Sequence, residues 1–180
     1  MRIVAGAAKG RRLAPPAPAT RPTSDRTREA LFNTLAGYVR LDGARVLDLY
    51  AGTGAVGLEA LSRGADEVVL VESNRRAIDV IRRNVETVGL PGATVVPRAV
   101  NGFLADESDE PFDLIFADPP YAEDPGLGIA IWAERWLARD GIVVVERDAR
   151  SGSPFTGIAS LTLAREARYG DTVLWYGRPR

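Results

Sequence analysis

Short apolar runs alternate along the chain with stretches whose apolar residues recur at helical spacing. Continuous runs of Val, Leu and Ile predict strands that are buried on both faces, as in a parallel sheet. Five such runs cover residues 45–49, 67–72, 93–97, 112–118 and 142–146. Helical spacing occurs at residues 55–63, 74–88 and 127–138. This alternation predicts an α/β fold, in which helices cover both faces of a mostly parallel sheet.

The two ends of the chain carry different patterns. Residues 160–167 and 172–176 alternate apolar with polar side chains on either side of Tyr169-Gly170-Asp171. This arrangement predicts a closing antiparallel hairpin, which brings the expected total to seven strands. At the N-terminus, residues 2–5 and 11–13 predict a small hairpin.

A Pro- and Ala-rich stretch at residues 14–20 predicts an extended linker, and a helix is expected to begin near Ser24. We therefore expect the chain to have two parts. Residues 1–22 form a basic N-terminal extension, and residues 23–180 form one larger domain.

Histidine and cysteine are both absent from the 180 residues. Disulfide bonds, thiolate chemistry, Ser-His-Asp triads and ordinary zinc sites are therefore excluded, and we expect no metal. The apolar runs are too short to span a bilayer, and the first residues lack the apolar core of a signal peptide. We expect a cytoplasmic monomer that makes no contact with membranes.

The N-terminal part of the chain is basic. Residues 1–40 hold eight of the 23 basic residues but only two of the 24 acidic residues. Such a block predicts an anionic partner, although a solvated basic surface would have the same composition. The residues that we expect to contact this partner are Arg2, Lys9, Arg11, Arg12 and Arg21.

A glycine-rich turn follows the first apolar run. Gly52-Thr53-Gly54-Ala55-Val56-Gly57 lies between a predicted strand and a predicted helix, and Glu72 ends the next strand. This is the pattern of a dinucleotide site, in which the acid binds the ribose. Asp48 favours another cofactor, because a carboxylate inside the strand repels a pyrophosphate but attracts an ammonium and a sulfonium. The sequence therefore favours S-adenosylmethionine over a nicotinamide dinucleotide.

The fourth predicted strand ends in Asp118-Pro119-Pro120-Tyr121. The two prolines fix φ and lack N–H donors, so that the loop is rigid. Asp118 and the Pro119 carbonyl can accept both hydrogens of an exocyclic amine, while the Tyr121 ring can stack on a base. Such acceptors can orient a weakly nucleophilic amine toward a methyl group without a strong base. The structural alternative is a Pro-rich turn that only closes the strand.

Both motifs resemble those of known methyltransferases. Residues 46–54 resemble the first motif of class I methyltransferases. Asp118 to Tyr121 resemble the Asp-Pro-Pro-Tyr motif of amino-methyltransferases that act on adenine N6 or guanine N2.

The rest of the chain is similar to the RsmD family, which methylates guanine N2 in bacterial small-subunit ribosomal RNA. The similar segments are residues 2–6, 9–13, 21–33 and 168–172. The resemblance implies a Rossmann-like class I methyltransferase fold, S-adenosylmethionine as cofactor and a guanine of 16S ribosomal RNA as target. The RNA would lie within the small subunit or an assembly intermediate, and the basic extension would contact it.

The resemblance also implies which residues bind the cofactor. In this fold the first motif holds the methionine part, the acid after the second strand holds the ribose, and the third strand ends near the adenine. The implied residues are Asp48, Tyr50, Gly52, Thr53, Gly54, Glu72, Ser73, Ala99 and Val100.

The start of the helix near Ser24 is a further candidate site. Helix N-termini bind anions, and the methionine carboxylate of the cofactor is one candidate. Thr23 and Arg28 would contact it there. The alternative is a helix that packs on the sheet edge with its charges in solvent.

Three other functions remain open. A DNA adenine-N6 methyltransferase would use the same catalytic loop, but the chain lacks an obvious insertion for target recognition. A nicotinamide-dependent oxidoreductase is disfavoured by Asp48 and by the segment that begins at Asp118. A non-catalytic RNA-binding module is disfavoured because Asp48, Glu72 and Asp118 are all present.

Overall fold

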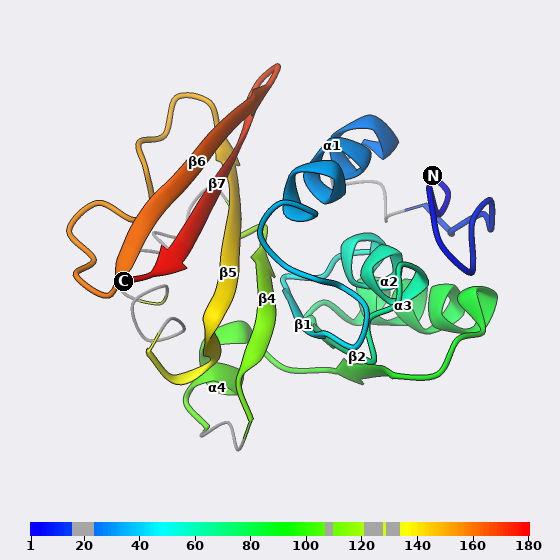
Figure 1. Ribbon diagram of the computed structural model, residues 1–180. Helices are drawn as coiled ribbons and strands as arrows, with labels where there is room; N and C mark the ends of the chain where they lie inside the picture. The colour runs from blue at the N-terminus through cyan, green and yellow to red at the C-terminus, as the bar shows by residue number, and fades with distance from the viewer. Residues whose placement is uncertain (16–23, 107–109, 121–127, 129–133) are drawn as a thin grey trace.

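Seven strands form one sheet in the order β3-β2-β1-β4-β5-β7-β6 (Figure 1). The computed structural model describes residues 1–15, 24–106, 110–120, 128 and 134–180. The strands are β1 (Arg45–Leu49), β2 (Glu67–Val71), β3 (Ala93–Val96), β4 (Phe112–Ala117), β5 (Leu137–Asp148), β6 (Leu161–Tyr169) and β7 (Thr172–Pro179). The first five run parallel, while β7 pairs antiparallel with β5 and β6. The sheet confirms the predicted α/β class and its closing hairpin.

Helices cover both faces of the sheet. The helices are α1 (Asp25–Leu35), α2 (Ala55–Ser62), α3 (Arg75–Val88) and α4 (Val100–Leu104). Apolar residues of the first three share one hydrophobic core with alternate strand residues, and α4 packs with Trp136 in the core on the other face. Local signals set the helix ends, and α1 begins close to its predicted start near Ser24. Ser24 Oγ accepts from Thr27 N at 3.0 Å, Asn74 caps α3, and Gly89 ends α3 with a φ of 57°.

Two elements differ from the prediction. The apolar pattern does not predict α4, whose Val100 and Leu104 are buried beneath the sheet. The predicted helix over residues 127–138 is wrong at its end, because β5 already begins at Leu137. There Leu137 pairs with Phe112 across a register shift in β4, and this long-range pairing outweighs the helical spacing. Most of the remainder of that predicted helix lies outside the described residues.

The N-terminal segment, residues 1–15, folds back onto α2. Arg2 and Arg12 form a single antiparallel bridge, which is less than the predicted two-stranded hairpin. Two consecutive backbone amides, of Val4 and Ala5, donate to the carboxylate of Glu59 at 2.7 and 2.9 Å. Three apolar side chains of the segment are buried in the core that α1 and α2 share: Ile3, Ala8 and Leu13.

The predicted boundary after residue 22 falls among residues 16–23, which lie outside the described part of the chain. The division into parts 1–22 and 23–180 therefore stays a prediction. In the part that is described, no helix is both long enough and apolar enough to cross a bilayer.

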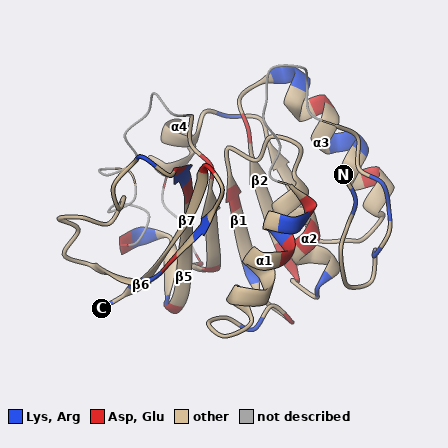
Figure 2. Cartoon of the chain, turned by 90° about the horizontal axis from the view of Figure 1, so that it is seen from above, with Lys and Arg blue, Asp and Glu red and all other residues tan. Residues whose placement is uncertain are grey.

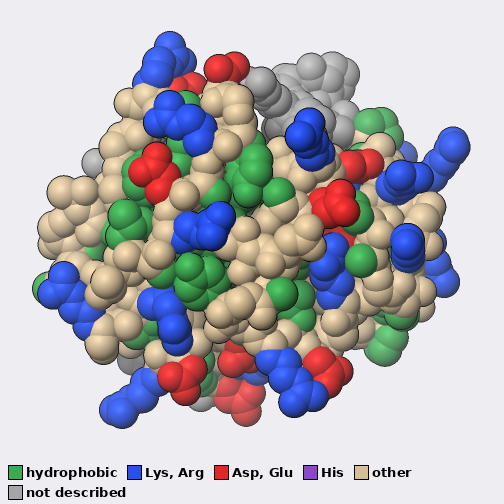
Figure 3. All heavy atoms as spheres, turned by 45° about the horizontal axis from the view of Figure 1, so that its top comes forward, with side chains coloured by type: hydrophobic (Ala, Val, Ile, Leu, Met, Phe, Trp, Pro, Cys, Tyr) green, Lys and Arg blue, Asp and Glu red, His purple; other side chains and the backbone are tan. Residues whose placement is uncertain are grey.

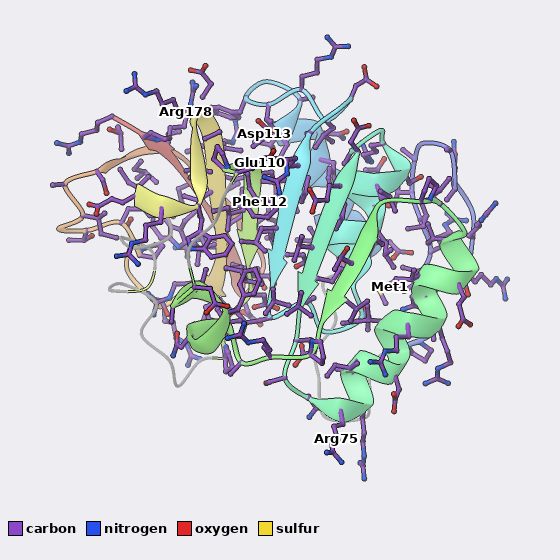
Figure 4. The ribbon with its side chains drawn as sticks, turned by 90° about the horizontal axis from the view of Figure 1, so that it is seen from below. Met1, Arg75, Glu110, Phe112, Asp113 and Arg178 are labelled. Atoms are coloured by element: carbon purple, nitrogen blue, oxygen red, sulfur yellow. The ribbon has the colours of Figure 1, made fainter. Side chains whose placement is uncertain are left out.

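The strand order reverses its direction at β1, which lies between β2 and β4. Open α/β sheets bind ligands at such a switch point, beyond the carboxyl ends of the strands. Figure 4 shows which end this is: Arg75, just after β2, lies at the opposite end of the sheet from Phe112 and Asp113, which begin β4.

Candidate active site

Three predicted site carboxylates lie at the carboxyl ends of neighbouring strands. Asp48 is the fourth residue of β1, Glu72 follows β2 directly, and Asp118 follows β4 directly. Asp48 is paired in register with Leu70 and Phe116, so that Glu72 and Asp118 each stand two residues beyond its level. Because side chains alternate between the faces of a strand, all three carboxylates project from the same face. The fold thus brings them together at the switch point.

Asp48 lies beneath the glycine-rich turn with only 2% of its surface exposed. Its Oδ2 accepts a hydrogen bond from Gly57 N at 2.8 Å. Burial raises the pKa of Asp48 to about 8; the bond from Gly57 opposes this effect, and the negative charge of Glu72 adds to it. A cation placed beside Asp48 would offset this burial and restore the carboxylate. The position therefore suits a positively charged ligand.

The turn itself is shaped for close approach. Gly54 adopts a left-handed φ of 74° and serves as the N-cap of α2. A Cβ on Gly57 would come within 2.6 Å of Leu70 Cδ2, so that glycine lets α2 pack directly on β2. Glu72 Oε2 accepts from Gly52 N at 2.9 Å and ties the turn to β2.

A small cavity of about 70 Å³ opens beside this turn. Its six lining residues are Tyr50, Glu72, Ser73, Ala99, Val100 and Asn101. The first five are residues that the sequence analysis assigns to the cofactor, and the fold gathers them from β1, β2 and the start of α4. Asn101 is the sixth, and it was not among the residues expected to bind the cofactor, because the end of the third strand carries no distinctive residue. The Glu72 carboxylate is held in place, since Oε1 accepts from the backbone amides of Ser73 and Asn74, both at 2.8 Å.

Asp118 is half-buried, between buried Ala117 and buried Pro119. Burial raises the pKa of Asp118 to about 8, and the negative charges of Glu146 and Asp48 add to the shift. Pro120 is exposed. Tyr121 lies outside the described residues, so that its stacking role stays a prediction.

Glu146 is a further acid of the candidate site, and it was not expected from the sequence. It lies near the end of β5, and its charge reaches Asp118. A signal was present, because Glu146 follows the apolar run Ile142–Val145 just as Glu72 and Asp118 follow theirs. The signal points to Asp118 only once the strand order is known, because β5 lies beside β4.

Arg28 lies in a different environment from the predicted cofactor contact. Its side chain is fully buried, with Nε 3.5 Å from Glu59 Oε2 and Nη2 2.8 Å from Asp25 Oδ1. Nη2 also donates to the carbonyl of Arg2. These contacts direct Arg28 toward the N-terminal segment, and its contact with the cofactor stays a prediction. Thr23 and Arg21 lie outside the described residues.

Asn84 connects Thr53 of the glycine-rich turn to the N-terminal segment. Asn84 Nδ2 donates to the Thr53 carbonyl at 2.8 Å, and Asn84 Oδ1 accepts from Ala14 N at 2.7 Å. Asn84 is fully buried on α3. A side chain of α3 thus bonds to both the glycine-rich turn and the N-terminal segment, a link that no local pattern in the sequence indicates.

The basic residues of the N-terminal segment are exposed, and Figure 2 shows that this segment lies beside α3. Arg11 also contacts α3: its Nη1 donates to the carbonyls of Thr87 and Val88 at the end of that helix. A cation in this position stabilises the helix C-terminus. Arg2, Lys9 and Arg12 are the remaining predicted RNA contacts in the described segment. Figure 3 shows basic side chains distributed over one face of the molecule, interspersed with polar and apolar surface.

The chain also matches known proteins over nearly its whole length. Residues 1–178 match the family described as conserved hypothetical protein 95. Ribosomal RNA small subunit methyltransferase D of Escherichia coli (strain K12) is 38% identical, over 95% of this chain and 86% of the relative. YlbH of Bacillus subtilis (strain 168) is 36% identical, over 96% of this chain and 95% of the relative.

A solved structure agrees with these sequence matches. The structure of yhhF from Escherichia coli is similar with a TM-score of 0.88 at 34% identity, and the match covers 100% of this chain and 98% of that one. Sequence and fold therefore agree along the full length of the chain. The chain is a methyltransferase of the RsmD family, the family described as conserved hypothetical protein 95.

Proposed function

We propose that this protein transfers a methyl group from S-adenosylmethionine to the exocyclic N2 amine of a guanine in 16S ribosomal RNA. One observation carries the proposal: Asp118 and buried Pro119 follow β4 at the switch point, on the same face of the sheet as Asp48 and Glu72. Acceptors for an amine therefore lie next to a site that suits a cationic cofactor. The name of the Escherichia coli relative supports ribosomal RNA of the small subunit as the substrate.

The residues of the described site fit S-adenosylmethionine. Buried Asp48 favours a cation, Glu72 offers carboxylate oxygens to ribose hydroxyls, and the cavity beside Tyr50 and Val100 can take the edge of the adenine. The bound cofactor supplies an electrophilic methyl group on a sulfonium. Gly52 and Gly54 would allow the backbone to approach it closely.

Asp118 performs two tasks in the reaction. Before transfer, its carboxylate and the Pro119 carbonyl accept hydrogen bonds from the two amine hydrogens and direct the nitrogen lone pair toward the methyl group. As the nitrogen–methyl bond forms and the sulfur–methyl bond breaks, the nitrogen becomes acidic, and Asp118 takes its proton. A pKa raised to about 8 makes ionised Asp118 a better proton acceptor than an ordinary carboxylate, and it requires that Asp118 lose its own proton before transfer, a state that is more populated as the pH rises toward 8.

The decisive experiment supplies the purified protein with labelled S-adenosylmethionine and with small ribosomal subunits that lack the modification. We expect label in 16S ribosomal RNA, at N2 of a single guanine, with large subunits and genomic DNA as controls. Label on an adenine of the DNA would instead support an adenine-N6 methyltransferase. Absence of label from all nucleic acids would contradict the proposal.

Asp48→Asn is expected to weaken the binding of S-adenosylmethionine and to reduce its dependence on pH. In the wild-type protein, the Asp48 carboxyl is protonated below pH 8, so that a cationic ligand must displace a proton. Affinity should therefore fall as the pH is lowered from 8 to 6, by up to about tenfold per pH unit for one proton. Calorimetry at both pH values measures this.

The variant is the matched control, since the amino group of the cofactor titrates in both proteins. The role of Asp48 would be contradicted if the variant bound the cofactor as tightly as the wild-type protein, with the same dependence on pH.

We propose further that the exposed cations of the N-terminal segment bind phosphates of the RNA. The double variant Lys9→Ala/Arg12→Ala should weaken RNA binding and reduce the slope of log affinity against log salt concentration by about 1 to 2. Arg40→Ala is the control, because Arg40 is also exposed but lies beyond the end of α1 and pairs with Asp42. An unchanged salt slope in the double variant would mean that these residues have no role in RNA binding.

A further inference from the structure

The sheet places Glu146 directly beside Asp118. β4 and β5 run parallel with Ala117 paired to Val145, so that the next residue on each strand is one of the two acids. Neighbouring strands lie about 4.8 Å apart, which sets the separation of the two side-chain origins. The negative charge of Glu146 contributes to the raised pKa of Asp118, as expected for two carboxyl groups this close.

Both side chains project from the same face of the sheet. Phe116 and Val144, each two residues earlier, belong to the hydrophobic core on the face that α1 and α2 cover. Leu174, which is paired with Glu146 on β7, belongs to the same core. Because the faces alternate along a strand, Asp118 and Glu146 also emerge on this face. They form an adjacent pair rather than two acids on opposite sides.

Glu146 lies farther from the glycine-rich turn than Asp118 does, on the side where the substrate would bind. The turn and Asp48 belong to β1, Asp118 to the next strand and Glu146 to the strand after that. Moving outward from the cofactor, the order is therefore Asp48, Asp118, Glu146. A base whose amine is bound at Asp118 would present its neighbouring ring atom to Glu146.

We propose that Glu146 accepts the N1–H of the target guanine while Asp118 accepts the N2 amine, so that the two acids together select guanine over adenine. The inference rests on the proposed function. Guanine carries two adjacent donors, N1–H and the N2 amine, on its Watson–Crick edge. Adenine carries an acceptor, N1, beside its N6 amine, and this lone pair would face the carboxylate of Glu146. Flipped bases are read by hydrogen bonds to this edge.

The test compares two substrates and two enzymes. Small subunits are reconstituted with 16S ribosomal RNA that carries either guanine or 2-aminopurine at the position where the label maps. 2-Aminopurine keeps the exocyclic amine but has an acceptor in place of N1–H. We expect wild-type kcat/KM to be about 10- to 100-fold higher for guanine, the range of one good hydrogen-bonded contact to a base.

In Glu146→Gln this preference should fall toward one, because the amide can also donate to the N1 lone pair of 2-aminopurine. Glu166→Gln is the matched control, since Glu166 is exposed on β6 opposite Trp175, whose side chain lies in the other core. It should keep the wild-type preference. Calorimetry with S-adenosylhomocysteine shows whether each variant retains a folded cofactor site.

Two outcomes would overturn this inference alone: equal use of both substrates by the wild-type enzyme, or a wild-type preference in Glu146→Gln. The first does not depend on whether the variant folds. If Glu146 had a purely structural role, Glu146→Gln would keep the wild-type preference, because the substitution would lower the rates for guanine and for 2-aminopurine together. If the wild-type enzyme labels neither RNA, the proposed function itself fails.

Discussion

Asp118→Ala should reduce the rate of methyl transfer by about 10²- to 10³-fold, while its affinity for S-adenosylhomocysteine stays close to that of the wild-type protein. A loss of this size is typical when a preorganised electrostatic contact to the reacting group is removed. Asp118 follows β4 and would bind the target amine under the proposed function, whereas Asp48 and Glu72 accept hydrogen bonds from the glycine-rich turn, where the cofactor would bind. Single-turnover kinetics with small subunits, together with calorimetry, measure the two effects separately.

Asp118→Asn separates the two tasks of this residue. The amide oxygen can still accept a hydrogen bond from the amine, but it cannot take the proton. An intermediate rate would show that both tasks matter. If Asp118→Ala kept near-normal turnover on its own substrate, the amino-methyltransferase mechanism would have to be abandoned.

Glu59→Ala should lower the free energy of unfolding by about 3–5 kcal/mol, the typical cost of removing one partner of a buried ion pair. Glu59 and Arg28 are both fully buried, so that solvent does not screen their interaction. The same carboxylate accepts from Val4 N and Ala5 N, and from Arg63 Nε at 2.8 Å. Its loss therefore removes two hydrogen bonds that hold the N-terminal segment, and it leaves Asp25 as the remaining ion-pair partner of buried Arg28. Urea denaturation measures the change.

Glu86→Ala is the control, because Glu86 is exposed on α3, where a substitution is expected to change stability by no more than about 0.5 kcal/mol. Hydrogen exchange adds a second measurement: the amides of Val4 and Ala5 should lose protection in Glu59→Ala. If Glu59→Ala were as stable as Glu86→Ala, the buried pair would contribute nothing net to the fold.

The sequence by itself determined most of the elements and placed the acids of the candidate site at the ends of the strands. The strands from β1 to β4 coincide with apolar runs, and α3 begins and ends at a capping Asn74 and a left-handed Gly89. Such signals act over a few residues, so that they can be interpreted without knowing the tertiary fold. For the same reason, the acids that end β2 and β4 could be assigned to a site at the edge of the sheet, because the carboxyl ends of parallel strands meet there.

Only the tertiary structure decided where distant segments meet. β5 begins at Leu137 because Phe112 is its partner on β4, and Glu146 lies close to Asp118 because β5 pairs with β4. Arg28 pairs with Glu59 because the N-terminal segment packs on α2 and buries both side chains. These outcomes depend on burial and on contacts between residues far apart in sequence. A pattern along the chain records neither, because the free energy of a buried charge is set by the neighbours that the fold supplies.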